Sequence, residues 1–254
     1  MRLSMIVKLQ TNYFLIKINL HIYKFYLIIS LNYNVQISNA ILIPSFNSNS
    51  KLSRLIDEIR GHSSNTIIIV DDGSDIPITT DVDNVEIVRN SENRGKGYSL
   101  RVGFDYAASK DFTHVITMDS DLQHSPKDLT DFLEVNSSVD FVLGYREKDE
   151  SMPFHRKLSN SITSLLISKI IRLDILDSQC GFRRYSLSAV KGIEFKENGF
   201  QFESEVLIKA IKADTNIKQV KVRTIYDKDN KSYINHVSDT LKFIRLILRS
   251  LIRR

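Results

Sequence analysis

The chain has 254 residues, of which 42% are hydrophobic and 26% charged, a composition that excludes a disordered protein and suffices for one large domain with a full core. The single Cys180 excludes an intramolecular disulfide and fits a reducing, cytoplasmic compartment. The net charge of +5 fits nucleic acid, an anionic membrane surface or a phosphate-rich substrate, so the positions of the charges must decide among these partners.

Residues 1–36 form an N-terminal extension whose nature the sequence leaves open. Residues 14–31 are rich in Leu, Ile and Phe, but Lys17 and Lys24 interrupt them. A lysine at the centre of a span costs roughly 2.5 to 3.5 kcal/mol of insertion free energy, so no membrane-spanning helix is expected. No small-residue cleavage site follows, which disfavours a signal peptide. The alternation of apolar and polar residues over 16–23 predicts one or two strands, and a later translation start is the other alternative.

From Ile37 onward, short apolar runs alternate with amphipathic segments, which predicts strands alternating with helices. The predicted strands are 40–43, 66–70, 85–88, 114–118 and 141–143, and the predicted helices are 51–60, 97–108 and 127–133. The strands are continuously apolar, as in sheets that are covered on both faces. The pattern therefore predicts an α/β fold with a doubly wound, mostly parallel sheet.

Polar residues follow four of the predicted strands at their carboxyl ends. These segments are Pro44–Asn47, Asp71–Asp72, Asp119–Gln123 and Gly144–Arg146. Ligands of doubly wound sheets bind beyond the carboxyl ends of the strands. One acidic pair at a strand end can equally be the N-cap of the next helix. Four polar strand ends at one edge favour a binding site over capping alone.

The segment Asp119-Ser120-Asp121-Leu122-Gln123 supplies two carboxylates and an amide oxygen directly after a strand. A set of oxygen ligands favours Mg²⁺ or Mn²⁺, and Mg²⁺ usually keeps waters and shares itself with substrate phosphates. The motif therefore predicts a metal-dependent enzyme with a nucleotide-bearing substrate.

The C-terminal segment 237–254 is predicted to be a basic amphipathic helix. It contains no acid after Asp239, and its basic residues are Lys242, Arg245, Arg249, Arg253 and Arg254. The first four fall on one helical stripe beside apolar positions, which favours an anionic membrane surface as the partner rather than nucleic acid. A helix docked on the domain with a solvated basic face fits the same pattern equally well.

Five segments resemble, in order, glycosyltransferase family two with the GT-A fold, and most closely the polyprenyl-phosphate glycosyltransferases, the group of dolichyl-phosphate mannose synthase. They are Ile41–Asn47, Val70–Ser74, Asn93–Gly97, Met118–His124 and Gly181–Arg183. The resemblance implies a catalytic domain over 37–236. It also implies inverting transfer of a sugar from a nucleotide-sugar donor, GDP-mannose or UDP-hexose, to a polyprenyl or dolichyl phosphate. Such an enzyme would attach peripherally to the cytoplasmic face of the membrane.

By this resemblance, one set of residues surrounds the donor, with Asp72 accepting hydrogen bonds near the base and ribose. The implied donor-binding residues are Pro44, Phe46, Asn47, Asp72, Lys96, Asp119 and Ser120. The implied metal ligands are Asp119, Asp121 and Gln123, and the metal neutralises charge on the leaving diphosphate. Lys96 stands between two glycines, where it either contacts the diphosphate or simply opens a helix. Lys231, Ser232 and His236 resemble a loop near the donor phosphates.

Arg146, Arg156 and Arg183 match family elements on the acceptor side and, with Asp121, make up the implied catalytic set. A guanidinium group binds phosphate oxygens in a bidentate manner, so a lipid phosphate is a natural ligand. A phosphate monoester is largely dianionic at neutral pH, so it needs no general base to attack. Arg184, the next residue, is interpreted as a solvated side chain.

The segment Asp177–Arg183 lacks the Glu-Asp motif of relatives that act on sugar hydroxyls, and the chain has no Trp, which disfavours a cellulose-type or chitin-type synthase. Asp177 and Gln179 are predicted to shape the acceptor site. Cys180 is expected to pack in the interior, because no His partner is apparent for a nucleophile.

Glu203 and Glu205 open a predicted helix and are interpreted as structural residues or as residues that support the site without binding a ligand themselves. Two other functions remain open. A transferase of the same fold could act on a soluble sugar or protein hydroxyl. More remotely, Asp71, Asp72 and Asp119 imitate the acidic pocket of a receiver-like phosphoacceptor module.

Overall fold

The computed structural model describes residues 37–147, 152, 154–211, 214–225 and 236–252. The predictions for residues 1–36, for Lys231 and Ser232, for the His236 side chain, and for Arg253 and Arg254 lie outside this description. The described chain from Ser38 onward forms one compact unit.

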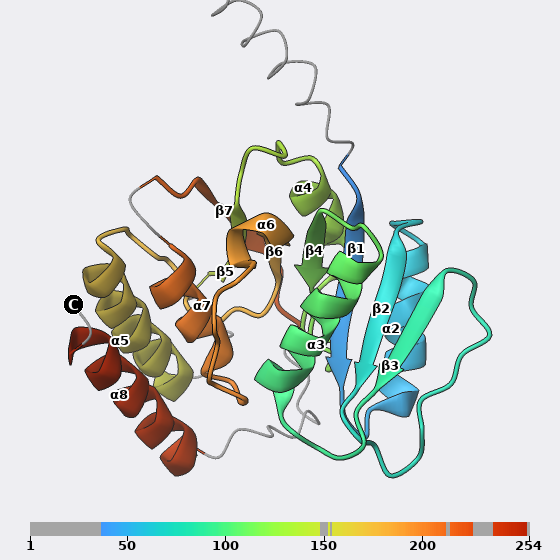
Figure 1. Cartoon of the computed structure of the whole chain (residues 1–254), viewed down its shortest axis with the longest axis horizontal. Coiled ribbons are helices and arrows are strands. Elements are labelled where there is room, and N and C mark those ends of the chain that lie inside the picture. The colour runs from blue at the N-terminus through green and yellow to red at the C-terminus, as the bar shows by residue number, and fades with distance from the viewer. Residues whose placement is uncertain (1–36, 148–151, 153, 212–213, 226–235, 253–254) are drawn as a thin grey trace, which may run out of the picture. The chain divides into compact units, whose positions relative to one another are not determined.

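A seven-stranded sheet has the order β3-β2-β1-β4-β6-β5-β7 (Figure 1). Its strands are β1 (Asn39–Ser45), β2 (Thr66–Asp71), β3 (Val85–Arg89), β4 (His114–Thr117), β5 (Phe141–Arg146), β6 (Arg183–Ser186) and β7 (Ile217–Val222). Within the described chain, only β6 runs antiparallel to its neighbours, which are β4 and β5. The prediction of a mostly parallel α/β sheet is confirmed.

Helices cover both faces of this sheet, and Figure 1 shows α3 in front of the strands and α2 behind them. The helices are α2 (Asn49–Arg60), α3 (Lys96–Ser109), α4 (Leu129–Leu133), α5 (Phe154–Ile171), α6 (Leu187–Val190), α7 (Phe202–Ala210) and α8 (His236–Ile252), with a 3-10 turn, η1, at Pro126–Asp128. Along β1, Leu42 packs with the α3 side, whereas Ile41 and Ile43 pack with the α2 side. Two apolar cores therefore fix the register of the strands, since a slip of one residue would exchange the two faces.

The C-terminal helix α8 buries Leu246 and Ile247, and Ile247 belongs to the same core cluster as residues of α5. Gln201 Nε2 also donates a hydrogen bond of 3.0 Å to the Asp239 carbonyl oxygen. Other apolar side chains of the helix remain exposed, namely Leu241, Ile244, Leu248 and Leu251. No helix within the described residues has both the length and the apolar character to cross a bilayer.

Candidate active site

The loops that follow β1 and β2 are tied to each other at the carboxyl edge of the sheet. Parallel pairing sets Ser45 opposite Asp71, so the next residues of both strands emerge side by side. The Asn47 backbone N–H donates to Ser74 Oγ at 2.9 Å, and the Asn47 side chain exchanges hydrogen bonds of 3.0 and 2.9 Å with Asp75. Asn47 has a φ of 50°, which Asn tolerates better than most residues. These hydrogen bonds hold the two loops together at the carboxyl edge of the sheet, where the donor-binding residues are predicted.

Three other predicted donor-binding residues differ in exposure. Pro44 is buried within β1, whereas Phe46 is half-buried just beyond the strand. Ser120 is also half-buried, in the turn after β4. Of these three residues, Phe46 and Ser120 retain surface that a donor could contact.

Asp71 supports the fold from the interior. Its carboxylate is fully buried, pairs with Arg89, and accepts hydrogen bonds from the backbone N–H groups of Ser74 at 2.9 Å and Ile78 at 3.3 Å. Burial alone would raise the pKa of Asp71, but the hydrogen bonds from Ser74 and Ile78 and the Arg89 guanidinium hold it below its ordinary value. Asp71 therefore stays ionised and holds the turn that follows β2.

Asp72 fixes the turn that leads into α3. Its carboxylate accepts hydrogen bonds from Asn90 Nδ2 at 2.7 Å and from the backbone N–H groups of Arg94 at 3.1 Å and Gly95 at 2.8 Å. Gly95 has a φ of 97°, and a Cβ there would lie 2.5 Å from the Asn198 carbonyl oxygen, so only glycine fits. By holding Gly95, Asp72 also sets the position of Lys96, the residue that follows it.

Lys96 joins two acids that lie far apart in the sequence. Its Nζ lies 2.6 Å from Asp119 Oδ1 and 2.6 Å from Glu203 Oε1, and 5.9 Å from the ring centroid of Phe200. Burial would lower the pKa of Lys96, but the charges of Asp119 and Glu203 outweigh burial and raise it. A Cβ on Gly181 would lie 2.7 Å from Asp119 Oδ2 and 3.0 Å from Lys96 Nζ. Lys96 is therefore a charged member of a tightly packed polar cluster.

The acidic turn after β4 holds two carboxylates in different environments. Burial would raise the pKa of Asp119, but Lys96 and His124, whose Nε2 is 3.7 Å from Asp119 Oδ2, hold it well below its ordinary range. Burial and the nearby charge of Asp119 raise the pKa of Asp121. Asp121 Oδ1 accepts a hydrogen bond of 2.9 Å from the Gln123 backbone N–H. This bond holds Asp121 and Gln123 together in one turn.

The donor set of this turn fits a hard divalent cation. Asp119, Asp121 and Gln123 supply only oxygen ligands, the type that Mg²⁺ and Mn²⁺ prefer. Among the residues that the structure describes, no group of three or more His, Cys, Asp or Glu side chains is placed to hold a metal by itself. Two carboxylates and an amide would leave other coordination positions to water and to the phosphates of a substrate.

Arg146 is held in a defined orientation at the end of β5. Its Nε and Nη2 lie 2.7 and 3.1 Å from the two oxygens of Asp177, and its side chain is 16% exposed. Burial would raise the pKa of Asp177, but Arg146 outweighs burial and lowers it. A further predicted arginine, Arg156, is half-buried near the start of α5.

Arg183 was predicted to bind the acceptor phosphate, but it lies in the interior of the domain. It is fully buried and donates to the carbonyl oxygens of Ser178 at 2.7 Å, Cys180 at 2.7 Å and Glu203 at 3.0 Å. A buried charge requires such partners. The Arg183 guanidinium group therefore donates its hydrogen bonds to these carbonyl oxygens, whereas the sequence predicted that it would bind a phosphate. Arg183 therefore joins the loop before β6 to α7 and does not reach an exposed phosphate.

Two neighbours of Arg183 are also interior residues. Arg184 is fully buried and donates to carbonyl oxygens of Phe132, Val135 and Asn136 at 2.6 to 2.9 Å, so its interpretation as solvated is wrong. Cys180 is buried as expected, and burial raises the pKa of its thiol to about 12, which excludes a thiolate nucleophile near neutral pH.

Glu203, for which the sequence allows either a structural role or indirect support of the site, contacts the polar cluster around Lys96. It lies 5% exposed in the first turn of α7, and its Oε1 contacts Lys96. Its Oε2 is buried and has no hydrogen-bond partner among the residues that the structure describes. The prediction that Glu203 opens a helix is confirmed, because α7 begins at Phe202. The partner across the site could not be inferred, because Lys96 opens a different helix on another part of the chain.

A doubly wound sheet with an acidic, oxygen-only turn at its carboxyl edge defines an enzyme of the GT-A nucleotide-sugar transferase type. Residues 40–192 match the family model described as glycosyl transferase family 2, and the chain belongs to this family. The resemblance seen in the sequence is confirmed, and the receiver-like alternative is excluded.

Similar proteins include two curated glycosyltransferases. The UDP-N-acetylglucosamine–dolichyl-phosphate N-acetylglucosaminyltransferase of Methanococcus voltae is 27% identical over 82% of this chain and 94% of its own. The polyprenol monophosphomannose synthase of Mycolicibacterium smegmatis is 22% identical over 72% of this chain and 75% of its own. A similar solved structure is glucosyl-3-phosphoglycerate synthase from Mycobacterium tuberculosis with Mn²⁺, UDP and product. It has a TM-score of 0.59 at 16% identity, covering 86% of this chain and 80% of that one, which is a likeness of fold.

Proposed function

We propose that this glycosyltransferase moves a sugar, with inversion, from a nucleotide-sugar donor to a polyprenyl or dolichyl phosphate, using Mg²⁺ or Mn²⁺, at the cytoplasmic face of a membrane. The observation that carries the proposal is that an acidic turn with oxygen donors and an oriented arginine lie on one sheet edge. Asp119 follows β4 and Arg146 ends β5, and these strands are separated only by β6. Two relatives, one named for dolichyl phosphate and one for polyprenol monophosphomannose, support the lipid phosphate as acceptor.

On the donor side, Asp119, Asp121 and Gln123 would hold the cation, which neutralises charge on the departing diphosphate when it is bound. Lys96, fixed by the turn that Asp72 organises, supplies a second positive charge beside them. On the acceptor side, Arg146 binds and orients the lipid phosphate, and Asp177 holds the guanidinium in place. One phosphate oxygen bonds to the anomeric carbon while the bond from that carbon to the diphosphate breaks, so no proton has to be removed.

The proposal is tested by offering purified protein labelled UDP-N-acetylglucosamine, UDP-glucose or GDP-mannose with polyprenyl phosphate and Mn²⁺. Label is expected in the lipid extract with one of these donors, and EDTA is expected to abolish the transfer. Equal incorporation into free sugars or peptides in the absence of lipid would instead identify an acceptor hydroxyl. Undiminished transfer to lipid in EDTA would refute the metal assignment alone.

An exposed apolar surface supports a membrane surface as the partner. On α8, Leu241, Ile244, Leu248 and Leu251 recur at intervals of three and four residues, so they share one helix face. On α5, Phe154, Leu158, Ile162 and Leu165 form a second exposed stripe. Both helices pack against the same core cluster. Along the sequence of α8, the basic residues Lys242, Arg245 and Arg249 alternate with these apolar residues. Helices that dock on anionic bilayers combine the two residue types in the same way.

Vesicle binding should therefore depend on the exposed stripe of α8. Ile244→Asp combined with Leu248→Asp is expected to lower binding to phosphatidylserine-containing vesicles at least tenfold, because burying each such side chain contributes about 1.5 to 3 kcal/mol. Co-sedimentation measures the effect. Ile76→Asp, at a side chain that is 72% exposed on another part of the domain, is the matched control and should bind as the unaltered protein does. Equal binding of all three proteins would show that α8 does not contact the bilayer.

A further inference from the structure

Lys96 and the proposed cation compete for the same oxygen. Lys96 Nζ lies 2.6 Å from Asp119 Oδ1, at ion-pair distance from a carboxylate that is a proposed metal ligand. A divalent cation that binds this oxygen must weaken or replace the contact. An ammonium deprived of its partner in a largely buried position is unfavourable, because burial penalises an unpaired charge. The fate of Lys96 therefore contributes to the affinity for the metal.

Glu203 is placed to keep Lys96 paired when Asp119 is taken. Its Oε1 lies 2.6 Å from the same ammonium group. Its backbone carbonyl accepts a hydrogen bond of 3.0 Å from the buried Arg183, which fixes this end of α7. Glu203 Oε2 is buried, and none of the described residues gives it a hydrogen bond. This oxygen therefore has no hydrogen-bond partner in the described part of the chain, and it belongs to the carboxylate that already contacts Lys96.

The packing around these groups leaves little room for another arrangement. A Cβ on Gly181 would come within 3.0 Å of both Lys96 Nζ and Asp119 Oδ1, and its backbone carbonyl is held by Thr117 Oγ1 at 2.7 Å. The ammonium group of Lys96 therefore lies close against Gly181. Of its two carboxylate partners, only Glu203 lies outside the acidic turn.

We infer that Lys96 is the resident counter-ion of Asp119, and that Glu203 is a positioning residue that retains the ammonium when a divalent cation binds Asp119. The inference rests on the proposed metal site and adds to it a built-in exchange of cations. Lys96 remains paired through Glu203 and stays beside the donor diphosphate. Glu203 thereby lowers the free energy needed for the metal to enter, without being a ligand of the metal.

Substitutions of Glu203 and of Lys96 should change the affinity for Mn²⁺ in opposite directions. Glu203→Gln removes one of the two carboxylates that contact Lys96 and leaves Asp119 as the other. The affinity for Mn²⁺ should therefore fall about tenfold, as expected for losing one charge at close range. Lys96→Met removes the competitor, so affinity should rise by about the same factor. Electron paramagnetic resonance of free Mn²⁺, titrated with the full chain in the absence of nucleotide, measures both. Binding of UDP or GDP in saturating Mn²⁺ should weaken in Lys96→Met.

The double variant separates this exchange from direct metal ligation by Glu203. Under the inference, Glu203→Gln lowers Mn²⁺ affinity at least threefold less in the Lys96→Met background than in the unaltered protein, because no ammonium is left to retain. Equal losses in both backgrounds would mean that Glu203 acts on the metal directly, which overturns the inference alone. Absence of Mn²⁺ binding by the unaltered protein would overturn the proposed metal site and the inference with it.

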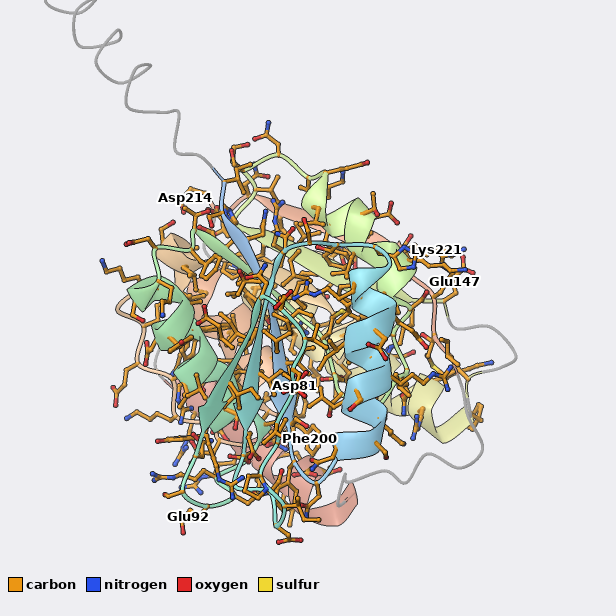
Figure 2. The ribbon with its side chains drawn as sticks, turned by 90° about the vertical axis from the view of Figure 1, so that its right-hand side faces the viewer. Asp81, Glu92, Glu147, Phe200, Asp214 and Lys221 are labelled. Atoms are coloured by element: carbon orange, nitrogen blue, oxygen red, sulfur yellow. The ribbon has the colours of Figure 1, made fainter. Side chains whose placement is uncertain are left out.

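Controls for this cycle come from the same chain. Lys221→Met removes an ammonium that pairs with Glu147 at 2.6 Å, and Figure 2 shows this pair well away from Phe200, the aromatic neighbour of Lys96. It should leave Mn²⁺ affinity unchanged. Circular dichroism confirms folding of each variant. If Lys96→Met does not fold, Lys96→Gln, which can still donate hydrogen bonds to both acids, takes its place in the cycle.

Discussion

Asp121→Asn is expected to lower kcat for sugar transfer about a thousandfold without unfolding the protein. A cation on a departing diphosphate contributes several kcal/mol of transition-state stabilisation, and about 4 kcal/mol corresponds to this factor in rate. An amide in place of the carboxylate removes one of the two charges that would hold the cation. Transfer of labelled sugar at saturating Mn²⁺, with both substrates in excess, measures the change.

The fold should tolerate this substitution for an electrostatic reason. Burial and the charge of Asp119 raise the pKa of Asp121, so its ionised form is less favourable in the folded than in the unfolded protein. Such a group contributes stability when protonated, and that contribution is lost as the pH rises through its folded pKa. A neutral amide at pH 7 should therefore leave the metal-free protein at least as stable, as a melting temperature would show.

Asp131→Asn is the matched control for this experiment, because Asp131 is an exposed acid on α4. It should retain full activity and the same dependence on Mn²⁺. If Asp121→Asn kept more than a tenth of the activity, the acidic turn would not be the centre that stabilises the leaving group.

Arg146→Lys should lower kcat/KM for the polyprenyl phosphate about a hundredfold while leaving the KM for the donor unchanged. A charge-assisted hydrogen bond contributes about 1.5 to 3 kcal/mol, and lysine cannot present the planar fork that contacts Asp177 and a phosphate together. Lysine is preferred to alanine because it keeps a cation beside the buried Asp177, whose isolation would destabilise the fold. Initial rates with each substrate varied in turn separate the two KM values.

A second arginine with nearly the same pairing provides the control. Arg223 contacts Asp128 through its backbone N–H and its Nε, both at 2.7 Å, just as Arg146 contacts Asp177 through these two groups. Arg223→Lys should therefore reproduce any general effect of losing the pair without changing the KM for the lipid. An equal loss in both variants would assign Arg146 to the stability of the fold and not to the acceptor.

The fold was predictable where local patterns control it. The predicted strands 40–43 and 66–70 lie within β1 and β2, because continuous apolar runs are stable only when both faces are buried. The predicted helix 127–133 is a 3-10 turn at Pro126–Asp128 followed by a short helix. β6 was not predicted, since Arg183-Arg184-Tyr185-Ser186 has no apolar run although all four residues are buried.

The sequence by itself determined the family, the doubly wound sheet and the acidic turn Asp119–Gln123, because apolar runs and adjacent ligands are local properties of the chain. Only the tertiary structure decided which charges serve the site. Arg183 meets three carbonyl oxygens in the interior, whereas Arg146 keeps a partly exposed guanidinium beside Asp177. Lys96 meets Glu203 from another helix. Whether a charged side chain is buried or exposed depends on the groups that distant segments bring next to it. The residues adjacent in sequence do not reveal those groups.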